Sequence, residues 1–125
     1  MKILVTGGAG FIGSHLVDKM INEKHDVYVI DDMSGGNYAN LHWRIVERAK
    51  LATIDLRDDL LVDEAIERIK PEIIFHLAAN AAENKAQFSP IDITSRNWNT
   101  FINTLTPFIK YGGKRFVFVS SIAVY

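Results

Sequence analysis

Three glycines at a spacing of three residues are the part of this sequence with the clearest chemical meaning. Gly7, Gly10 and Gly13 follow a short apolar run, and a helical pattern begins at Phe11. A strand, a glycine-rich turn and a helix in this order are typical of a site that binds the pyrophosphate of a dinucleotide. The first glycine can adopt the tight turn, the second leaves room for the pyrophosphate, and the third lets the helix approach the strand. The N–H groups at the helix start, those of Phe11 and Ile12, would face the anion. The alternative is an ordinary glycine-rich turn.

Two aspartates end the second apolar run. Asp31 and Asp32 follow residues 27–30, in which β-branched side chains predominate. A carboxylate at the tip of a second strand can accept hydrogen bonds from both hydroxyls of an adenosine ribose, and it would repel a 2′-phosphate. Because no Arg or Lys lies between Asp31 and Arg44 to offset that repulsion, the sequence favours NAD over NADP. The alternative is that the aspartates only cap the turn before the following Gly-Gly pair.

Length and composition limit the classes of function. The chain has 125 residues, 48% of them apolar, which is enough to bury one core in a single domain without an internal linker. The net charge is −1 and the charges are scattered, so nucleic acid is not an expected partner. No apolar run reaches the length of a membrane span, and we expect neither a signal peptide nor a membrane partner. There are no cysteines and the four histidines lack metal-ligand spacing, so no metal site is expected, and a cytoplasmic location is compatible with this usage.

Apolar runs alternate along the chain with segments that have helical patterns. The strand-like runs cover residues 2–6, 27–31, 51–54, 73–77 and 115–120. The helical segments cover about residues 11–23, 58–69 and 89–111. Such alternation predicts parallel strands joined by right-handed crossovers.

The helical segments carry further local signals. The spacing in the first helix places six residues near one face: Phe11, Ile12, His15, Leu16, Lys19 and Met20. His15 is therefore expected to be a packed or partly exposed helix residue and not a ligand. Pro107 is expected to kink or interrupt the last helix. Residues 33–49 are expected to form a surface loop with a short helix.

Six landmarks occur in the order found in one known family. They are residues 6–13 (TGGAGFIG), Asp31-Asp32, Asp55-Leu56-Arg57, His76-Leu77-Ala78-Ala79, Asn97 and residues 120–125 (SSIAVY). On these residues the chain resembles the extended short-chain dehydrogenase/reductase family, in particular its NAD-dependent nucleotide-sugar epimerases and dehydratases of the UDP-glucose 4-epimerase type. The resemblance implies an α/β fold, a Rossmann-type doubly wound parallel sheet with strand order 3-2-1-4-5, truncated before the remaining strands and the substrate domain. Residues 1–125 would be an incomplete NAD-binding Rossmann domain.

The resemblance also assigns cofactor contacts after the third and fourth strands. It implies that Asp55 meets the adenine, with the backbone of Leu56 adjacent. It further implies that Leu77, Ala78 and Ala79 form a shelf of small residues under the ribose and pyrophosphate of the cofactor. The alternatives are that Asp55 is a turn or helix-capping residue, and that the shelf is the end of a plain buried strand.

Two further residues are assigned to the active site by the same resemblance. Asn97 resembles the family's helix asparagine, although the Gly-Thr two residues further on is replaced here by Asn99-Thr100. Ser121 stands where the family places a catalytic Ser or Thr that donates a hydrogen bond to a sugar oxygen. The alternative for Ser121 is a strand-end serine that satisfies backbone groups.

The family's proton-transfer pair, Tyr-x-x-x-Lys, does not occur in the printed sequence. The residues four positions after Tyr28, Tyr38 and Tyr111 are Asp, His and Arg, and Tyr125 is the last residue. Without such a neighbour a phenol with a pKa near about 10 is a poor base at neutral pH. We therefore expect an N-terminal fragment that alone is inactive and self-associates, and that belongs to a homodimer when complete.

By resemblance, the chain is the NAD-binding portion of an enzyme that converts a nucleotide sugar by transient hydride transfer to NAD. One alternative is an NAD-dependent dehydrogenase or reductase, which would accumulate NADH. Another is a non-catalytic NAD-sensing module, if 125 residues is the natural length.

Overall fold

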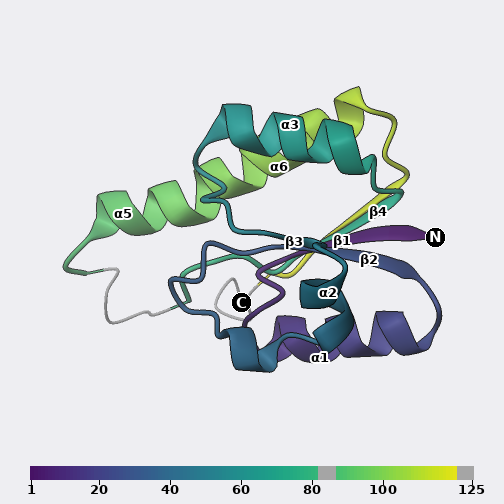
Figure 1. Cartoon of the computed structure of the whole chain (residues 1–125). Helices are drawn as coiled ribbons and strands as arrows, with labels where there is room; N and C mark the ends of the chain where they lie inside the picture. The colour runs from purple at the N-terminus through teal and green to yellow at the C-terminus, as the bar shows by residue number, and fades with distance from the viewer. Residues whose placement is uncertain (82–86, 121–125) are drawn as a thin grey trace.

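A five-stranded parallel sheet forms the centre of the molecule (Figure 1). The computed structural model describes residues 1–81 and 87–120. The strands are β1 (Lys2–Thr6), β2 (Asp26–Ile30), β3 (Leu51–Ala52), β4 (Ile73–His76) and β5 (Arg115–Phe118). Their order is β3-β2-β1-β4-β5, and every neighbouring pair is parallel. The predicted Rossmann-type fold and strand order 3-2-1-4-5 are confirmed, although β3 is shorter than the predicted strand.

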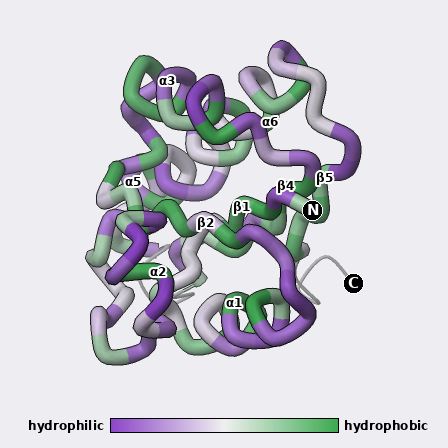
Figure 2. Tube along the Cα trace, turned by 45° about the vertical axis from the view of Figure 1, so that its right-hand side comes forward, coloured by the Kyte–Doolittle hydropathy of each residue, from purple (hydrophilic) through white to green (hydrophobic). Residues whose placement is uncertain are grey.

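Helices cover both faces of this sheet. They are α1 (Phe11–Asn22), α2 (Trp43–Glu47), α3 (Asp59–Ile69), α5 (Pro90–Thr94) and α6 (Thr100–Lys110). A 3₁₀ turn, Tyr38–Asn40, precedes α2, and a π-helical turn, Ser95–Asn99, joins α5 to α6. Figures 1 and 2 show α1 and α2 on one side of the strands and α3 and α6 on the other. None of the helices in the described ranges has both the length and the apolar character needed to cross a bilayer.

The central strand β1 contributes to two separate cores. Ile3 and Val5 pack with the α1 side, whereas Leu4 packs with α3 and α6, because successive side chains of a strand point to opposite faces. These three side chains are at most 1% exposed. A strand that is apolar on both faces is typical of a parallel sheet with helices on both sides. The short apolar run before the glycines is therefore long enough to anchor the loop that follows it.

Of the six residues that the spacing places near one face of α1, Met20 alone is buried, so that face is not the one that packs on the sheet. Val17, Met20 and Ile21 are buried, whereas Phe11 and Ile12 are 78% and 66% exposed. Gly13, which was expected to let the helix approach the strand, forms the buried stripe together with Ser14, Val17 and Ile21. The buried stripe of α1 is therefore the one that contains Gly13, and the apolar side chains of Phe11 and Ile12 in the first turn remain exposed.

The interruption that was one of the two outcomes expected at Pro107 is absent, because α6 continues through this residue to Lys110. Pro107 has no N–H to donate to the preceding turn, so the helix continues there with one backbone hydrogen bond fewer, and Pro107 and Phe108 are buried at that point. The irregularity lies upstream instead, in the π-helical turn Ser95–Asn99. The helix predicted near residues 58–69 is confirmed, with Asp58 capping it by accepting a hydrogen bond from Leu61 N.

Candidate functional site: a cleft at the strand ends

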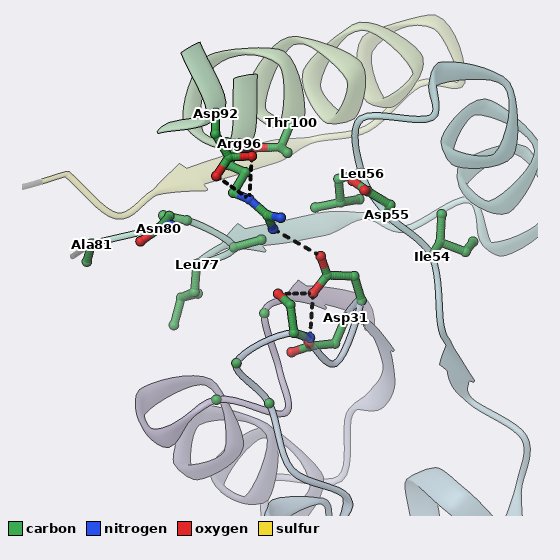
Figure 3. A pocket seen from close by; sticks show the side chains of 18 residues that line it. Asp31, Ile54, Asp55, Leu56, Leu77, Asn80, Ala81, Asp92, Arg96 and Thr100 are labelled. Carbon is green, nitrogen blue, oxygen red and sulfur yellow. Dashed lines mark hydrogen bonds and ion pairs between the residues drawn. The ribbon is translucent and has the colours of Figure 1, made fainter. Parts of the chain in front are cut away.

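A cleft of about 550 Å³ opens at the carboxyl ends of the central strands (Figure 3). Open α/β sheets bind ligands beyond these strand ends, where the strand order reverses, here between β1 and β4. Nine of the residues predicted to bind the cofactor line the cleft: Gly7, Gly10, Asp31, Asp32, Asp55, Leu56, Leu77, Ala78 and Ala79. Four others are not among the lining residues: Phe11, Ile12, Gly13 and Asn97.

The three glycines of the first loop have different surroundings. Gly7 has a φ of +71°, and a Cβ on it would lie 2.8 Å from Ala78 N. A Cβ on Gly13 would lie 2.1 Å from Gly7 O, so the close packing of α1 requires glycine there. A Cβ on Gly10 would meet only Gly7 O, at 3.3 Å. The turn and packing geometry thus needs Gly7 and Gly13, whereas Gly10 mainly keeps space open in the cleft.

Ala9, inside this loop, is held from several directions. Its N–H donates to Asp31 Oδ2 at 2.9 Å. Its carbonyl accepts hydrogen bonds from Asn37 N at 3.1 Å and Asn40 Nδ2 at 3.0 Å. The loop is therefore positioned by the chain segment after β2 before any ligand arrives.

The start of α1 offers free backbone donors at the edge of this loop. Gly10 is the N-cap residue, and no side chain caps the helix there or places an acidic group in its first turn. The first N–H groups of a helix have no carbonyl partner within the helix. Those of Phe11 and Ile12 can therefore bind an anion, assisted by the helix dipole, whereas Gly13 is buried and supports the packing of the helix.

Both aspartates after β2 hold the local turn. Asp31 is 8% exposed, and its Oδ1 accepts a hydrogen bond from Met33 N while its other oxygen holds Ala9. Asp32 Oδ1 accepts hydrogen bonds from Ser34 N at 2.9 Å and Ser34 Oγ at 2.6 Å. The turn-capping interpretation therefore holds for both residues. A carboxylate has about four acceptor positions, so these bonds leave capacity for ribose hydroxyls.

A chain of alternating charges runs along the cleft, and Figure 3 shows the contact of Arg96 with Asp92. Arg57 Nε donates to both oxygens of Asp55 at 3.0 Å, and Arg57 Nη1 lies 3.5 Å from Asp92 Oδ1. Arg96 Nε donates to the Asp92 carboxylate at 2.9 and 3.1 Å, and Arg96 Nη1 lies 3.6 Å from Asp32 Oδ2. The hydrogen bond from the Arg57 side chain lowers the pKa of Asp55, and the same bond raises the pKa of Arg57.

Asp55 also acts as a turn residue, which was the alternative interpretation of its role. Its Oδ1 accepts a hydrogen bond from Arg57 N at 2.9 Å, and its carbonyl accepts one from Asp58 N. The carboxylate thus lines the cleft and is already engaged by Arg57. Its contact with adenine stays a prediction.

The shelf after β4 lies directly beside the glycine loop. Leu77 N donates to Thr6 O at 3.1 Å, and Ala78 N donates to Thr6 Oγ1 at 3.3 Å. Thr6 Oγ1 also lies 2.9 Å from His76 Nδ1. Polar groups at the ends of β1 and β4 therefore fix the position of the shelf relative to the glycine loop.

Sequence reasoning missed several cleft residues, of which Arg96 and Asp92 are the most important. They lie on the segment after Pro90, where the sequence was interpreted only through its apolar spacing. An acidic and a basic residue four positions apart on a helix do form a detectable pair. Nothing in the local sequence, however, indicates that Arg96 reaches Asp32, which is 64 residues away.

Comparison with known proteins agrees with this geometry. Residues 3–125 match the profile of the NAD dependent epimerase/dehydratase family. The chain belongs to this family. It is 39% identical over 119 residues to a putative UDP-glucose 4-epimerase of Methanocaldococcus jannaschii, covering 95% of this chain and 37% of the relative. It is 34% identical over 125 residues to UDP-glucuronic acid decarboxylase 1 of Danio rerio, covering 99% of this chain and 28% of the relative.

Solved structures of family members have the same fold. The UDP-glucose 4-epimerase of Thermotoga maritima with UDP-glucose superimposes with a TM-score of 0.90 at 38% identity, over 97% of this chain and 38% of that protein. The enzyme of Thermus thermophilus in complex with NAD gives a TM-score of 0.90 at 32% identity, over 97% and 38%. The chain therefore spans less than two fifths of the length of these relatives.

The family's helix asparagine was assigned by resemblance to Asn97, and the structure places this residue in contact with Asn80, which follows the shelf. Asn97 Oδ1 accepts a hydrogen bond from Asn80 N at 2.8 Å, and Asn97 Nδ2 donates to Asn80 O at 3.2 Å. The side chain thus clamps both backbone groups of the residue that follows the shelf. Ser121 lies outside the described residues. Val119 N donates to His76 O at 3.3 Å, so the chain just before it runs along the end of β4.

Replacing Asn97 by Ala should destabilise the fold by about 1–3 kcal/mol, because both partly buried backbone groups of Asn80 lose this partner. Urea unfolding of the purified protein measures this change. Asn99→Ala is the matched control, since Asn99 is exposed and its side chain makes only a 3.5 Å contact with Ser95 Oγ. A loss below about 0.5 kcal/mol for Asn97→Ala, equal to that of the control, would contradict the clamp.

Proposed function

We propose that these residues form the NAD-binding part of a nucleotide-sugar epimerase or dehydratase. The observation that carries the proposal is the cleft at the switch point, where Gly10 adjoins the uncapped start of α1 and the carboxylates of Asp31, Asp32 and Asp55 line the same cleft. Membership of the NAD-dependent epimerase/dehydratase family supports it. When bound, NAD supplies the redox chemistry, by accepting and returning a hydride.

Different residues of the cleft would contact different parts of the cofactor. The N–H groups of Phe11 and Ile12 would hold the pyrophosphate over Gly10. Asp31 and Asp32 would accept hydrogen bonds from the adenosine ribose. Leu56, next to Asp55, would border the adenine, and the shelf residues 77–79 would lie under the cofactor. In this proposal the protein binds and orients the dinucleotide before the sugar reacts.

The proposed class of substrate is based on the relatives of this chain in the family. The relatives named above include UDP-glucose 4-epimerases and a UDP-glucuronic acid decarboxylase, which supports a nucleotide-sugar substrate. Ser121 would donate a hydrogen bond to a sugar oxygen while a neighbouring group moves the proton. The family's Tyr-x-x-x-Lys pair is not in the printed sequence, so we propose that these residues alone bind NAD without turnover. A cytoplasmic location remains a prediction.

A homodimer is also proposed, and exposed apolar side chains on the α5–α6 segment support it. Ile91, Trp98 and Ile109 are 85%, 60% and 66% exposed. An apolar surface of this kind is typical of a protein interface. Sedimentation of the purified protein measures the oligomeric state.

Calorimetric titration with NAD and with NADP tests the cofactor part of the proposal. NAD should bind at least about tenfold more tightly, because the carboxylates of Asp31 and Asp32 repel a 2′-phosphate. No binding of NAD, or tighter binding of NADP, would contradict the proposal. The alternatives are separated by incubating UDP-glucose with a longer chain that contains these residues and a Tyr-x-x-x-Lys pair. An epimerase or dehydratase forms a new sugar without net NADH, a dehydrogenase accumulates NADH, and a sensing module binds NAD without conversion.

A further inference from the structure

Arg96 places a cation beside the carboxylate that was expected to exclude a 2′-phosphate. Its Nη1 lies 3.6 Å from Asp32 Oδ2, and its side chain lines the cleft with 29% of its surface exposed. The sequence argument for NAD considered only residues near Asp31 along the chain. In the fold, a basic residue from the π-helical turn Ser95–Asn99 reaches the same place.

Two carboxylates keep the Arg96 guanidinium in this position. Its Nε donates to both oxygens of Asp92, four residues earlier on the same helical segment. One of its terminal nitrogens remains directed toward Asp32. Because Asp92 is also 3.5 Å from Arg57 Nη1, this carboxylate is shared by two arginines and does not neutralise Arg96 alone. Asp32 therefore supplies the counter-charge that remains on the cleft side.

Asp32 itself does not depend on Arg96 for its orientation. Its Oδ1 accepts two hydrogen bonds from Ser34, whereas Oδ2 is the oxygen that approaches Arg96. A ligand hydroxyl bound to Oδ2 would thus lie next to the guanidinium. An arginine fork matches phosphate geometry, so a phosphate at that place would have a cationic partner if the carboxylate were absent.

We propose that Arg96 is a specificity-determining residue of the adenosine end of the cleft, and that Asp32 masks its capacity to bind the 2′-phosphate of NADP. This inference rests on the proposed function, since it requires that the cleft binds a dinucleotide. Preference for NAD then depends on the Asp32–Arg96 pair and not on a lack of basic residues. When the Asp32 charge is removed, Arg96 should no longer pair with a carboxylate there and should be able to bind the 2′-phosphate of NADP.

The test is a double-mutant cycle on the ratio of NADP to NAD affinity, measured by calorimetry in the purified protein. Asp32→Asn keeps an acceptor for Ser34 and removes the charge. It should raise NADP affinity relative to NAD by about tenfold or more, the range of a charge-assisted hydrogen bond. The double variant Asp32→Asn/Arg96→Gln should lose most of that gain, whereas Asp32→Asn/Arg96→Lys should retain part of it.

The outcomes separate this inference from the proposed function. If the gain of Asp32→Asn is absent, or persists in the double variant with Arg96→Gln, Arg96 has no role in specificity while NAD binding still stands. If the unsubstituted protein binds neither dinucleotide, the proposed function fails and the inference fails with it. Circular dichroism of each variant shows whether the fold is retained. For an unfolded Asp32→Asn variant, Asp32→Ser gives the same comparison.

Discussion

Gly10→Val is expected to abolish NAD binding while the protein stays folded. Gly10 has extended backbone angles, φ −77° and ψ 177°, which valine adopts readily. A Cβ there meets only Gly7 O, at 3.3 Å, so the loop needs to shift by only a few tenths of an ångström. The branched side chain would then project into the cleft, over the N–H groups of Phe11 and Ile12. Loss of two such hydrogen bonds to an anion predicts a drop of at least about 100-fold in NAD affinity.

Gly13→Ala is the matched variant, in which we expect the stability of the fold to be lost instead of the space for NAD. Its Cβ would lie 2.1 Å from Gly7 O, a backbone atom, so α1 would have to move away from the loop. We expect a loss of about 3 kcal/mol or more in the free energy of unfolding. Calorimetric titration and urea unfolding of both variants measure the two effects. A Gly10→Val protein that binds NAD like the unsubstituted one would rule out a pyrophosphate over this residue.

The stability of the protein should fall steeply between neutral pH and pH 4 because of His76. This side chain is 2% exposed, and burial lowers its pKa from 6.5 to about 4. It lies against the Thr6 hydroxyl and the rings of Phe101, Phe116 and Phe118. Within the described parts of the chain, His76 Nε2 has no hydrogen-bond partner. An imidazolium would therefore be charged and buried without a counter-ion.

The direction of the effect follows from the two pKa values. The folded-state pKa is the lower one, so the unfolded chain takes up the proton first, and stability falls as the pH decreases below about 6.5. The expected loss is about 2 kcal/mol at pH 5 and about 3 kcal/mol at pH 4. Urea unfolding at several pH values measures it. His76→Gln should flatten this dependence, whereas His15→Gln, on the exposed side of α1, should not. An equal pH dependence in the protein and in His76→Gln would show that other groups are responsible.

Much of this architecture could be predicted because local patterns and tertiary packing agree. The positions of the five strands, the helix near residues 58–69 and the glycine spacing each depend on neighbours in sequence, and the fold follows from them. The face of α1 could not be predicted from apolar spacing, because its packing is decided by the missing side chain of Gly13. The continuation of α6 through Pro107 likewise depends on tertiary packing, here the burial of Pro107 and Phe108.

The parts of the site that lie within one continuous segment of the chain could be predicted from the sequence. The glycine loop, the acidic pair after β2 and the shelf after β4 each occupy one strand end, so the parallel sheet brings them together. The position of Arg96 next to Asp32 depends instead on how the π-helical turn Ser95–Asn99 aims one side chain across the cleft. Electrostatic partners from distant segments of this kind are not visible in a sequence.

Chemical-shift mapping of the ¹⁵N-labelled protein during NAD titration locates the dinucleotide site residue by residue. We expect saturable shifts that are largest at the backbone amides of Gly10, Phe11 and Ile12, with smaller ones at Asp32 and Ala78. Gly112, in the turn before β5, should not move. Shifts that do not saturate, or that spread away from the cleft and spare the start of α1, would contradict a dinucleotide site at this end of the sheet.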